Sequence, residues 1–210
     1  MEIMYSNKNY GMFDQKINCF YGDKLDLINL GYEFNGIEYD DEWLVKKFLN
    51  ENKFQNDIND LFNELDIKES LLKKKIIELS KGEFKLILFV YILLNKKEII
   101  VFDYFDKCLS FKYKKRLINY LKTKYNGKLV FISNDLEFLN TLSNNIIVFK
   151  DGEIIYNDEF NKLYKSDIKL EYPSVIKFID LANKKDAKLS YTVDRKELLK
   201  DIYRSVRWDI

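Results

Sequence analysis

The sequence has 210 residues and no histidine, which excludes a Ser-His-Asp triad, a histidine-ligated metal ion and a histidine general base. Cysteine occurs only at Cys19 and Cys108. Two isolated cysteines form neither a metal site nor a disulfide scaffold, so a reducing cytosol is the expected environment. Proline occurs once, and Pro173 is therefore the best candidate for a boundary between structural units.

An excess of one charge is also missing, because 35 basic and 34 acidic residues give a net charge of +1. This balance offers no electrostatic footprint for nucleic acid or for a membrane surface. The longest apolar run, residues 86–94, is far shorter than the roughly 18 residues that a membrane span needs. The opening M-E-I-M-Y lacks the basic and apolar regions of a secretory signal. With 47% hydrophobic residues, the chain can bury one core and carry an appendage.

The most informative stretch is residues 78–109. Ser80, followed three residues later by Glu83, predicts a capping box at a helix start. Residues 84–94 are apolar almost all round, which predicts a helix buried on every side. Residues 98–103 predict a strand buried on both faces, as in a parallel sheet. The strand ends at Asp103, where open α/β sheets bind ligands.

This order of elements resembles the ATP-binding cassette (ABC) ATPases, from about Leu30 to the C-terminus. In that family an L-S-G-G-Q signature opens a helix, and a Walker B strand ending in Asp-Glu precedes a D-loop. The positions that keep the family residue are Leu79, Ser80, Gly82, Asp103 and Leu109. The positions that depart from it are Lys81 for a glycine, Glu83 for the glutamine, Tyr104 for the catalytic glutamate and Ser110 for the D-loop aspartate.

The other nucleotide motifs of the family are weak here. Phe34-Asn35 lies where the family has its Q-loop glutamine, and a short strand with a turn at Gly36 explains it equally well. Asn134 stands in place of the switch histidine, with capping by Ser133 or Asn134 as the alternative role. Gly22 and Lys24 follow a predicted strand, Ile17–Tyr21, without the G-x-x-x-x-G-K-[ST] pattern of a phosphate loop, so a plain turn is expected there.

The rest of the chain suggests two units, residues 1–164 and 165–210, with a helical subdomain at about 40–95. Residues 42–50, 56–65 and 111–124 predict helices, residues 128–133 predict a strand, and Asp151-Gly152 predicts a hairpin turn. In the tail, residues 173–183 and 194–206 predict helices, the second with Leu199, Ile202 and Tyr203 on one face. The tail resembles the C-terminal extension of energy-coupling-factor (ECF) transporter ATPases; the alternative is a helical hairpin packed on its own domain.

The sequence therefore predicts an α/β fold of the P-loop NTPase (ABC) type, with a mostly parallel sheet, a helical subdomain, a truncated or degenerate N-terminal part and a C-terminal helical extension. We expect no ATP hydrolysis by the chain alone, because Asp103 is the only catalytic group kept and Tyr104 has a reference pKa of about 10.

The resemblance implies an ECF-type transport subunit that pairs with an intact ATPase. Ser80, Lys81, Gly82 and Glu83 would face ATP held with Mg²⁺ mainly by that partner, and Asp103 is a candidate metal ligand. A transmembrane subunit, or a second copy bound through the tail, is a further expected partner. The expected location is the cytoplasmic face of the membrane. The alternative is a non-catalytic binding module that keeps the fold only to dock a partner. The ATPase head of a DNA-repair or chromosome protein is disfavoured by the neutral charge and absent coiled coil.

Overall fold

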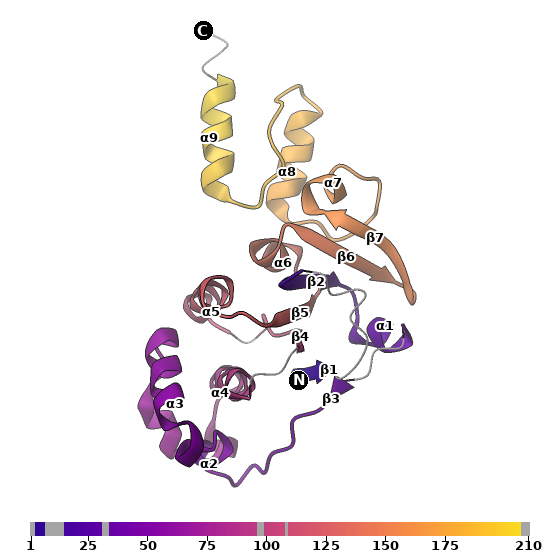
Figure 1. The fold of residues 1–210 in the computed structure, drawn as a ribbon. Helices are drawn as coiled ribbons and strands as arrows, with labels where there is room; N and C mark the ends of the chain where they lie inside the picture. The colour runs from indigo at the N-terminus through magenta and orange to yellow at the C-terminus, as the bar shows by residue number, and fades with distance from the viewer. Residues whose placement is uncertain (1–2, 7–14, 31–33, 96–98, 108, 207–210) are drawn as a thin grey trace.

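The structure is a computed structural model that describes residues 3–6, 15–30, 34–95, 99–107 and 109–206. It confirms the predicted α/β fold. Within these ranges the strands form a seven-stranded sheet in the order β3-β1-β4-β5-β2-β6-β7 (Figure 1). The strands are β1 Ile3–Ser6, β2 Ile17–Tyr21, β3 Phe34–Asn35, β4 Ile99–Asp103, β5 Lys128–Ser133, β6 Asn145–Lys150 and β7 Glu153–Glu159.

The centre of the sheet is parallel, because β5 pairs in parallel with both β4 and β2, and β2 with β6. Antiparallel pairs flank this centre, β1 and β3 beyond β4 and the hairpin strand β7 beyond β6. The hairpin turn falls at the predicted Asp151-Gly152, whose φ values of 54° and 82° suit a glycine-containing tight turn. The carboxyl ends of the parallel strands therefore meet at one edge of the sheet.

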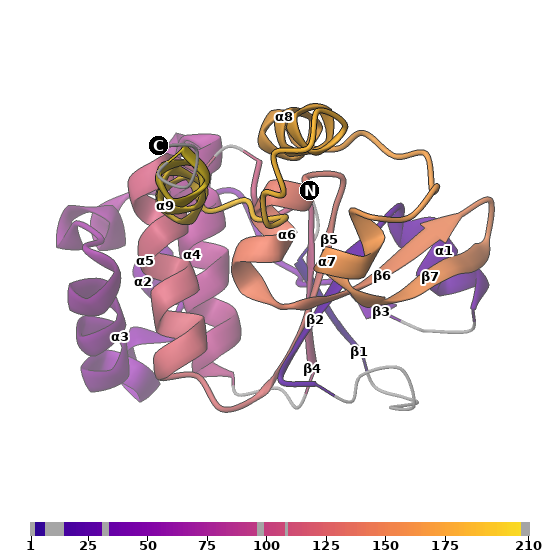
Figure 2. The same ribbon diagram turned by 90° about the horizontal axis from the view of Figure 1, so that it is seen from above.

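Helices cover both faces of the sheet, with α4, α5 and α6 on one side and α1 on the other (Figures 1 and 2). The helices are α1 Lys24–Asn29, α2 Val45–Phe48, α3 Glu51–Leu65, α4 Lys81–Leu94, α5 Phe111–Thr123, α6 Leu136–Leu142, α7 Phe160–Leu163, α8 Ser174–Asn183 and α9 Arg195–Val206, with 3₁₀ turns at Glu69–Lys73 and Ile76–Glu78.

The sheet separates two hydrophobic clusters, which explains why the central strands are apolar at nearly every position. The smaller cluster joins Leu27 of α1 to alternate strand residues such as Val101, Ile132 and Phe149. The larger cluster holds the intervening residues, such as Phe102 and Phe131, with the inward faces of α4, α5 and α6. The predicted double-sided burial of the strand that ends at Asp103 is confirmed.

Two predicted helix boundaries in the helical subdomain are wrong. The helix expected over residues 42–50 is reduced to α2, because Val45 N–H and Ile76 N–H bond the carbonyls of Lys74 and Trp43 in an extended pairing. The helix expected over residues 56–65 begins earlier, at Glu51, after Asn50 in a left-handed conformation. Phe54, with φ −123°, interrupts its first turn.

The tail carries α8 and α9 beside the hairpin side of the sheet (Figure 1). Ile176 and Ile179 of α8 are buried. In α9 the buried residue is Leu198, whereas Leu199 and Tyr203 of the predicted apolar face are 54% and 71% exposed. Within the described ranges, every helix is too short or too polar to cross a membrane.

Candidate nucleotide-facing site

The carboxyl edge of the parallel strands brings together the residues that end the strands and the residues that follow them. Asp103 ends β4 level with Ile132 of β5, and Tyr21 ends β2 level with Ser133. Gly22, Tyr104 and Asn134 follow directly after these strand ends. Because β5 lies between β4 and β2, the edge forms a continuous surface over three adjacent strands.

Tyr104, at the position of the family's catalytic glutamate, closes across this edge. Its backbone is left-handed, with φ 46°, an uncommon conformation for a non-glycine residue that costs on the order of 1–3 kcal/mol. Its N–H donates to the Ile132 carbonyl at 2.9 Å, and its hydroxyl donates to the Gly22 carbonyl at 3.2 Å. The side chain therefore spans from the end of β4, past β5, to the end of β2.

The surroundings of Tyr104 are acidic. Burial raises the pKa of its phenol, and the carboxylates of Asp23 and Asp103 raise it further, while a hydrogen bond with the Asn134 side chain opposes them. The Lys107 ammonium lies 4.4 Å from the centre of the tyrosine ring. The phenol is thus held neutral, and the two aspartates beside it disfavour a phosphate.

The turn after β4 is fixed from below by Lys85 of α4. This lysine is only 3% exposed, and its Nζ donates to the carbonyls of Tyr104 at 3.0 Å, Phe105 at 3.4 Å and Lys107. Sequence reasoning missed this role. The available signal is that Lys85 is the only charged residue in the apolar segment 84–94.

A second buried contact joins the same turn to the end of β5. Ser133 Oγ donates to the buried Asp106 carboxylate at 3.0 Å and accepts the Asp135 N–H at 3.0 Å. The N-cap of α6 is Asp135, whose carboxylate accepts the Phe138 N–H. The predicted capping role of Ser133 or Asn134 is wrong, because β5 pairs with β2 through Ser133 and the helix begins two residues beyond Asn134.

The start of α4 confirms the predicted capping box. Glu83 N–H donates to Ser80 Oγ at 3.2 Å, and Ser80 N–H donates to Glu83 Oε2 at 2.8 Å. The Ser80 amide is the main cause that lowers the pKa of Glu83, and Lys74, 3.1 Å from Glu83 Oε1, adds to it. Ser80 and Lys81 are exposed and Gly82 is half-buried. The helix start therefore presents a hydroxyl and the positive end of the helix dipole to solvent.

Asn35 does not join this group. It pairs with Tyr5 of β1, which in turn pairs with Ile100 of β4. Asn35 thus lies level with the second residue of β4, three residues short of Asp103, and β1 separates the two strands. The Q-loop role of Asn35 stays a prediction.

The turn at Gly22 is part of a strand-turn-helix unit, in which the predicted strand and turn are confirmed and helix α1 was not predicted. β2 lies in the middle of the parallel strands, and only Gly22 and Asp23 separate it from α1. Asp23 Oδ1 accepts the Leu25 N–H at the start of the helix. A phosphate loop cradles phosphates with successive backbone N–H groups, whereas this turn offers a carbonyl already bonded to Tyr104 and a carboxylate. The residues of this edge do not fit the phosphates of a nucleoside triphosphate.

The metal role of Asp103 also stays a prediction. Among the described residues, no three His, Cys, Asp or Glu side chains form a group that could hold a metal ion. Mg²⁺ is commonly held by one or two carboxylates together with phosphate oxygens. An ion at Asp103 would therefore need phosphate from a bound nucleotide, which the edge does not fit.

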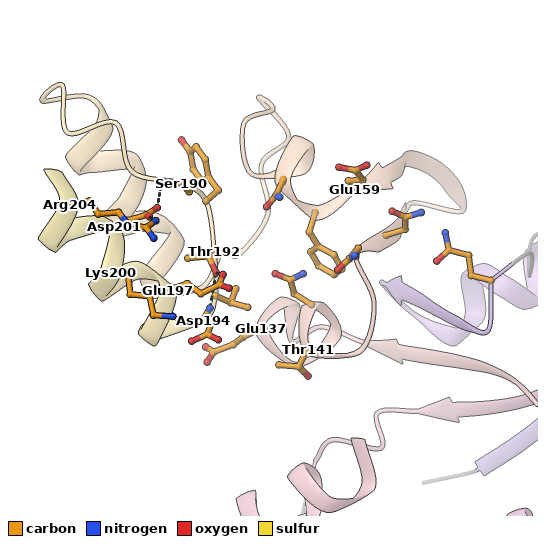
Figure 3. A pocket seen from close by; sticks show the side chains of 18 residues that line it. Glu137, Thr141, Glu159, Ser190, Thr192, Asp194, Glu197, Lys200, Asp201 and Arg204 are labelled. Atoms are coloured by element: carbon orange, nitrogen blue, oxygen red, sulfur yellow. Dashed lines mark hydrogen bonds and ion pairs between the residues drawn. The ribbon is translucent and has the colours of Figure 1, made fainter. Parts of the chain in front are cut away.

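A cavity of about 1100 Å³ lies elsewhere, between the hairpin side of the sheet and the tail. In Figure 3, Glu137 and Thr141 of α6 face Glu197, Lys200, Asp201 and Arg204 of α9 across it. None of the candidate nucleotide residues lines this cavity. The tail nevertheless reaches the edge at one point, because the Tyr21 side chain at the end of β2 hydrogen-bonds the backbone of Glu171.

No family model matches the sequence. The chain is 30% identical over 137 residues to the zinc import ATP-binding protein ZnuC of Ehrlichia chaffeensis, which covers 58% of this chain and 56% of that protein. It is 26% identical over 184 residues to the energy-coupling factor transporter ATP-binding protein EcfA1 of Ureaplasma parvum, which covers 82% of this chain and 62% of that protein. The chain thus spans less than two thirds of the length of these relatives.

In structure, a cobalt transport ATP-binding protein, CbiO-2, matches with a TM-score of 0.59 at 12% identity, covering 83% of this chain and 85% of that chain. The complex of archaeal ribosomal stalk protein aP1 and ribosome recycling factor aABCE1 matches with a TM-score of 0.53 at 17% identity, over 79% of this chain and 41% of that chain. The fold is that of an ABC ATPase. Its similarity in sequence is to ATP-binding subunits of ABC transporters, an ECF subunit among them, so the predicted resemblance is confirmed.

Proposed function

We propose that the chain is an ABC-type subunit of an ECF-like transport system that pairs with an intact ATPase and completes a composite nucleotide site on that partner. The observation that carries the proposal is the exposed, fully capped start of α4, with Ser80 and Lys81 open to solvent. An anion is favoured there by the positive end of the helix dipole. Glu83 does not oppose it fully, because its carboxylate is turned back onto the Ser80 amide and Lys74.

In this proposal ATP and Mg²⁺ are held mainly by the partner, and the chain does not hydrolyse ATP at its own edge. Tyr104, Asp23 and the carbonyl of Gly22 stand where phosphate chemistry would need donors and a base. Similarity to EcfA1 over 82% of this chain supports the ECF-like assignment. A transmembrane subunit and a place at the inner face of the membrane follow from the same assignment.

The test is to reconstitute the chain with an intact ABC ATPase and to compare the ATPase rates supported by wild type, Ser80→Ala and Gly82→Asp. Losing one hydrogen bond to a charged group costs about 1.5–3 kcal/mol, or roughly ten- to a hundredfold in rate if the bond forms only in the transition state. Gly82→Asp should be worse, because it places a carboxylate against phosphate. Thr123→Ala at the far end of α5 is the control, with an unchanged rate expected.

The opposite result supports a second function. If both variants assemble with the partner and leave its rate unchanged, the start of α4 is only a helix cap. The chain would then be a binding module that keeps the ABC fold to dock a partner. The edge around Tyr104 favours this alternative, because it is acidic and is held by the hydrogen bond from Tyr104 to the Gly22 carbonyl without a nucleotide.

We assign residues 1–164 to the ABC-like domain, with residues 40–95 as its helical subdomain, and residues 165–210 to a tail that mediates association. The support is that the tail exposes apolar side chains on both helices, namely Phe178, Leu181, Leu199 and Tyr203. Light scattering on Leu199→Asp/Tyr203→Asp, alone and with the ATPase partner, tests this. We expect a lower assembled mass with an unchanged circular dichroism spectrum; an unchanged mass would contradict the assignment.

A further inference from the structure

We propose that Tyr104 is a built-in latch, which closes the carboxyl edge onto the turn after β2 in place of a ligand, and that Lys85 is the residue that positions it. The proposal concerns the chain by itself and holds whether or not a partner presents a nucleotide to α4. It explains why a strand-turn-helix unit in the middle of a parallel sheet can be ordered without phosphate.

The first support is the reach of the tyrosine side chain. β4 and β2 are separated by β5, so their axes lie about 10 Å apart. The Tyr104 hydroxyl nevertheless bonds the Gly22 carbonyl, a partner 82 residues away in the sequence. A bond between the ends of two non-adjacent strands restrains both, and it occupies the space over the end of β5 between them.

The second support is that two independent contacts hold the backbone of Tyr104 in its left-handed conformation. Its N–H is bonded to Ile132 O at 2.9 Å, and its carbonyl accepts Lys85 Nζ at 3.0 Å. Lys85 also bonds the carbonyls of Phe105 and Lys107, so one buried ammonium gathers three carbonyls of the turn. Without these bonds the turn could relax to a negative φ, and the side chain would leave Gly22.

The third support is the charge at the edge. Asp23, Asp103 and Asp106 all act on the Tyr104 phenol, and the Lys107 ammonium lies over its ring. A neutral hydroxyl that donates to a carbonyl is compatible with these carboxylates, whereas an anion would be repelled by them. The latch is therefore compatible with its surroundings, and a bound phosphate is not.

Hydrogen exchange measured by mass spectrometry on the full chain tests the latch. We expect Tyr104→Ala to speed exchange about fivefold to tenfold in residues 22–27, because a cross-strand bond and its packing are lost there, and to leave residues 153–159 unchanged. Tyr104→Phe, which keeps the ring, should give a smaller increase in the same residues. The matched control is Tyr113→Phe on α5, which removes a hydroxyl that donates to the Asp66 carbonyl. Exchange in residues 22–27 of this variant should match the wild type.

The positioning role of Lys85 needs a readout that general destabilisation does not move. We expect Lys85→Met to speed exchange in residues 104–107 and 22–27, and to return the Tyr104 phenol toward its ordinary pKa of about 10 in an ultraviolet titration, taken as the difference from Lys85→Met/Tyr104→Phe. Uniformly faster exchange with no change in that phenol would reduce Lys85 to a structural residue.

Two results would overturn the latch. One is that residues 22–27 of the Tyr104→Ala variant exchange at the same rate as in the wild type. The other is protection of residues 22–27 in the wild type on adding Mg·ATP or inorganic phosphate, because the edge would then be open to a ligand. Unchanged exchange with either addition is the expected result.

Discussion

The start of α4 and the carboxyl edge of β4 lie within one stretch of 25 residues and have opposite chemistry. The helix start presents backbone donors, the Ser80 hydroxyl and the Lys81 ammonium to solvent. The strand edge presents carboxylates and a carbonyl, and the Tyr104 hydroxyl there is bonded within the chain. The difference shows that two neighbouring parts of one ABC fold can offer opposite electrostatic surroundings to an anion.

Lys85 shows how the two regions can differ and still belong to one rigid unit. It lies two residues beyond the capping box on α4 and bonds the turn that carries Tyr104. Lys85 thus ties helix α4 to the closed edge. Changes at the edge therefore need not disturb the cap, provided that Lys85 and the core below it remain.

The largest expected effect comes from removing the core beneath the edge. Phe102 is fully buried in β4, stacks on Phe131 with ring centres 4.7 Å apart and also contacts Phe89 and Phe105. Phe102→Ala should lower the free energy of unfolding by about 3–5 kcal/mol through lost burial and a cavity. Denaturant unfolding measures this. The control is Phe111→Ala, whose ring is 83% exposed and whose loss should change stability by less than about 0.5 kcal/mol.

Much of this region could be predicted from the sequence because its signals are local. The capping box at Ser80, the apolar helix after it, the strand to Asp103 and the Asp-Gly hairpin each depend on residues a few positions apart. The structure confirms all four. The boundary of α2 could not be read in this way, because Trp43 and Val45 are bonded to residues some 30 positions away.

The closed edge itself could not be predicted, because its contacts join distant parts of the chain. β2 is placed between β5 and β6, more than 100 residues downstream, by pairing that no local pattern encodes. The Tyr104 bond to Gly22 depends on that placement. The sequence showed only that Tyr104 stands in place of the family's catalytic glutamate. The structure adds its hydrogen bond to the Gly22 carbonyl.

The next largest effect should distinguish a full capping box from a simple cap. Ser80→Ala removes a cap with reciprocal bonds to Glu83 and should cost about 1 kcal/mol of stability. Ser110→Ala removes a cap on α5 that accepts a single bond from the Tyr113 N–H, 3.5 Å long. This change should lower the free energy of unfolding by only a few tenths of a kcal/mol. Urea unfolding of the two variants gives the comparison. Equal losses would mean that the reciprocal bond at Ser80 adds nothing.

A smaller effect should appear as a dependence on pH. The amide of Ser80, its hydroxyl and Lys74 lower the pKa of Glu83 in the folded chain. A lowered folded pKa gives stability that is complete above the unfolded value, about 4.3, and is lost as the pH falls through the folded value. Glu83→Gln keeps a residue that can complete a capping box but cannot ionise.

The stability difference between wild type and Glu83→Gln should therefore be largest near pH 7 and shrink below about pH 4. Unfolding in urea at several pH values measures it. A difference that stays constant from pH 7 to pH 3 would show that the Glu83 charge does not support the helix start, and that the cap is held by hydrogen bonds alone.

The smallest effect separates the two roles of the helix start, because they predict opposite signs. Lys81 is exposed in the first turn of α4, where a positive charge opposes the helix dipole. Lys81→Gln should therefore raise stability by about 0.3 kcal/mol. In the reconstituted assay the same change should weaken the response to ATP by a factor of about two to five, more strongly at low salt, because an exposed charge near phosphate is lost. Lys196→Gln is the matched control for stability alone, since Lys196 is exposed in the first turn of α9 and should give the same gain. If Lys81→Gln is stabilising and also leaves the response to ATP unchanged, the lysine supports neither the helix nor a partner's nucleotide. The chemical difference between the helix start and the strand edge would then have no consequence for ATP.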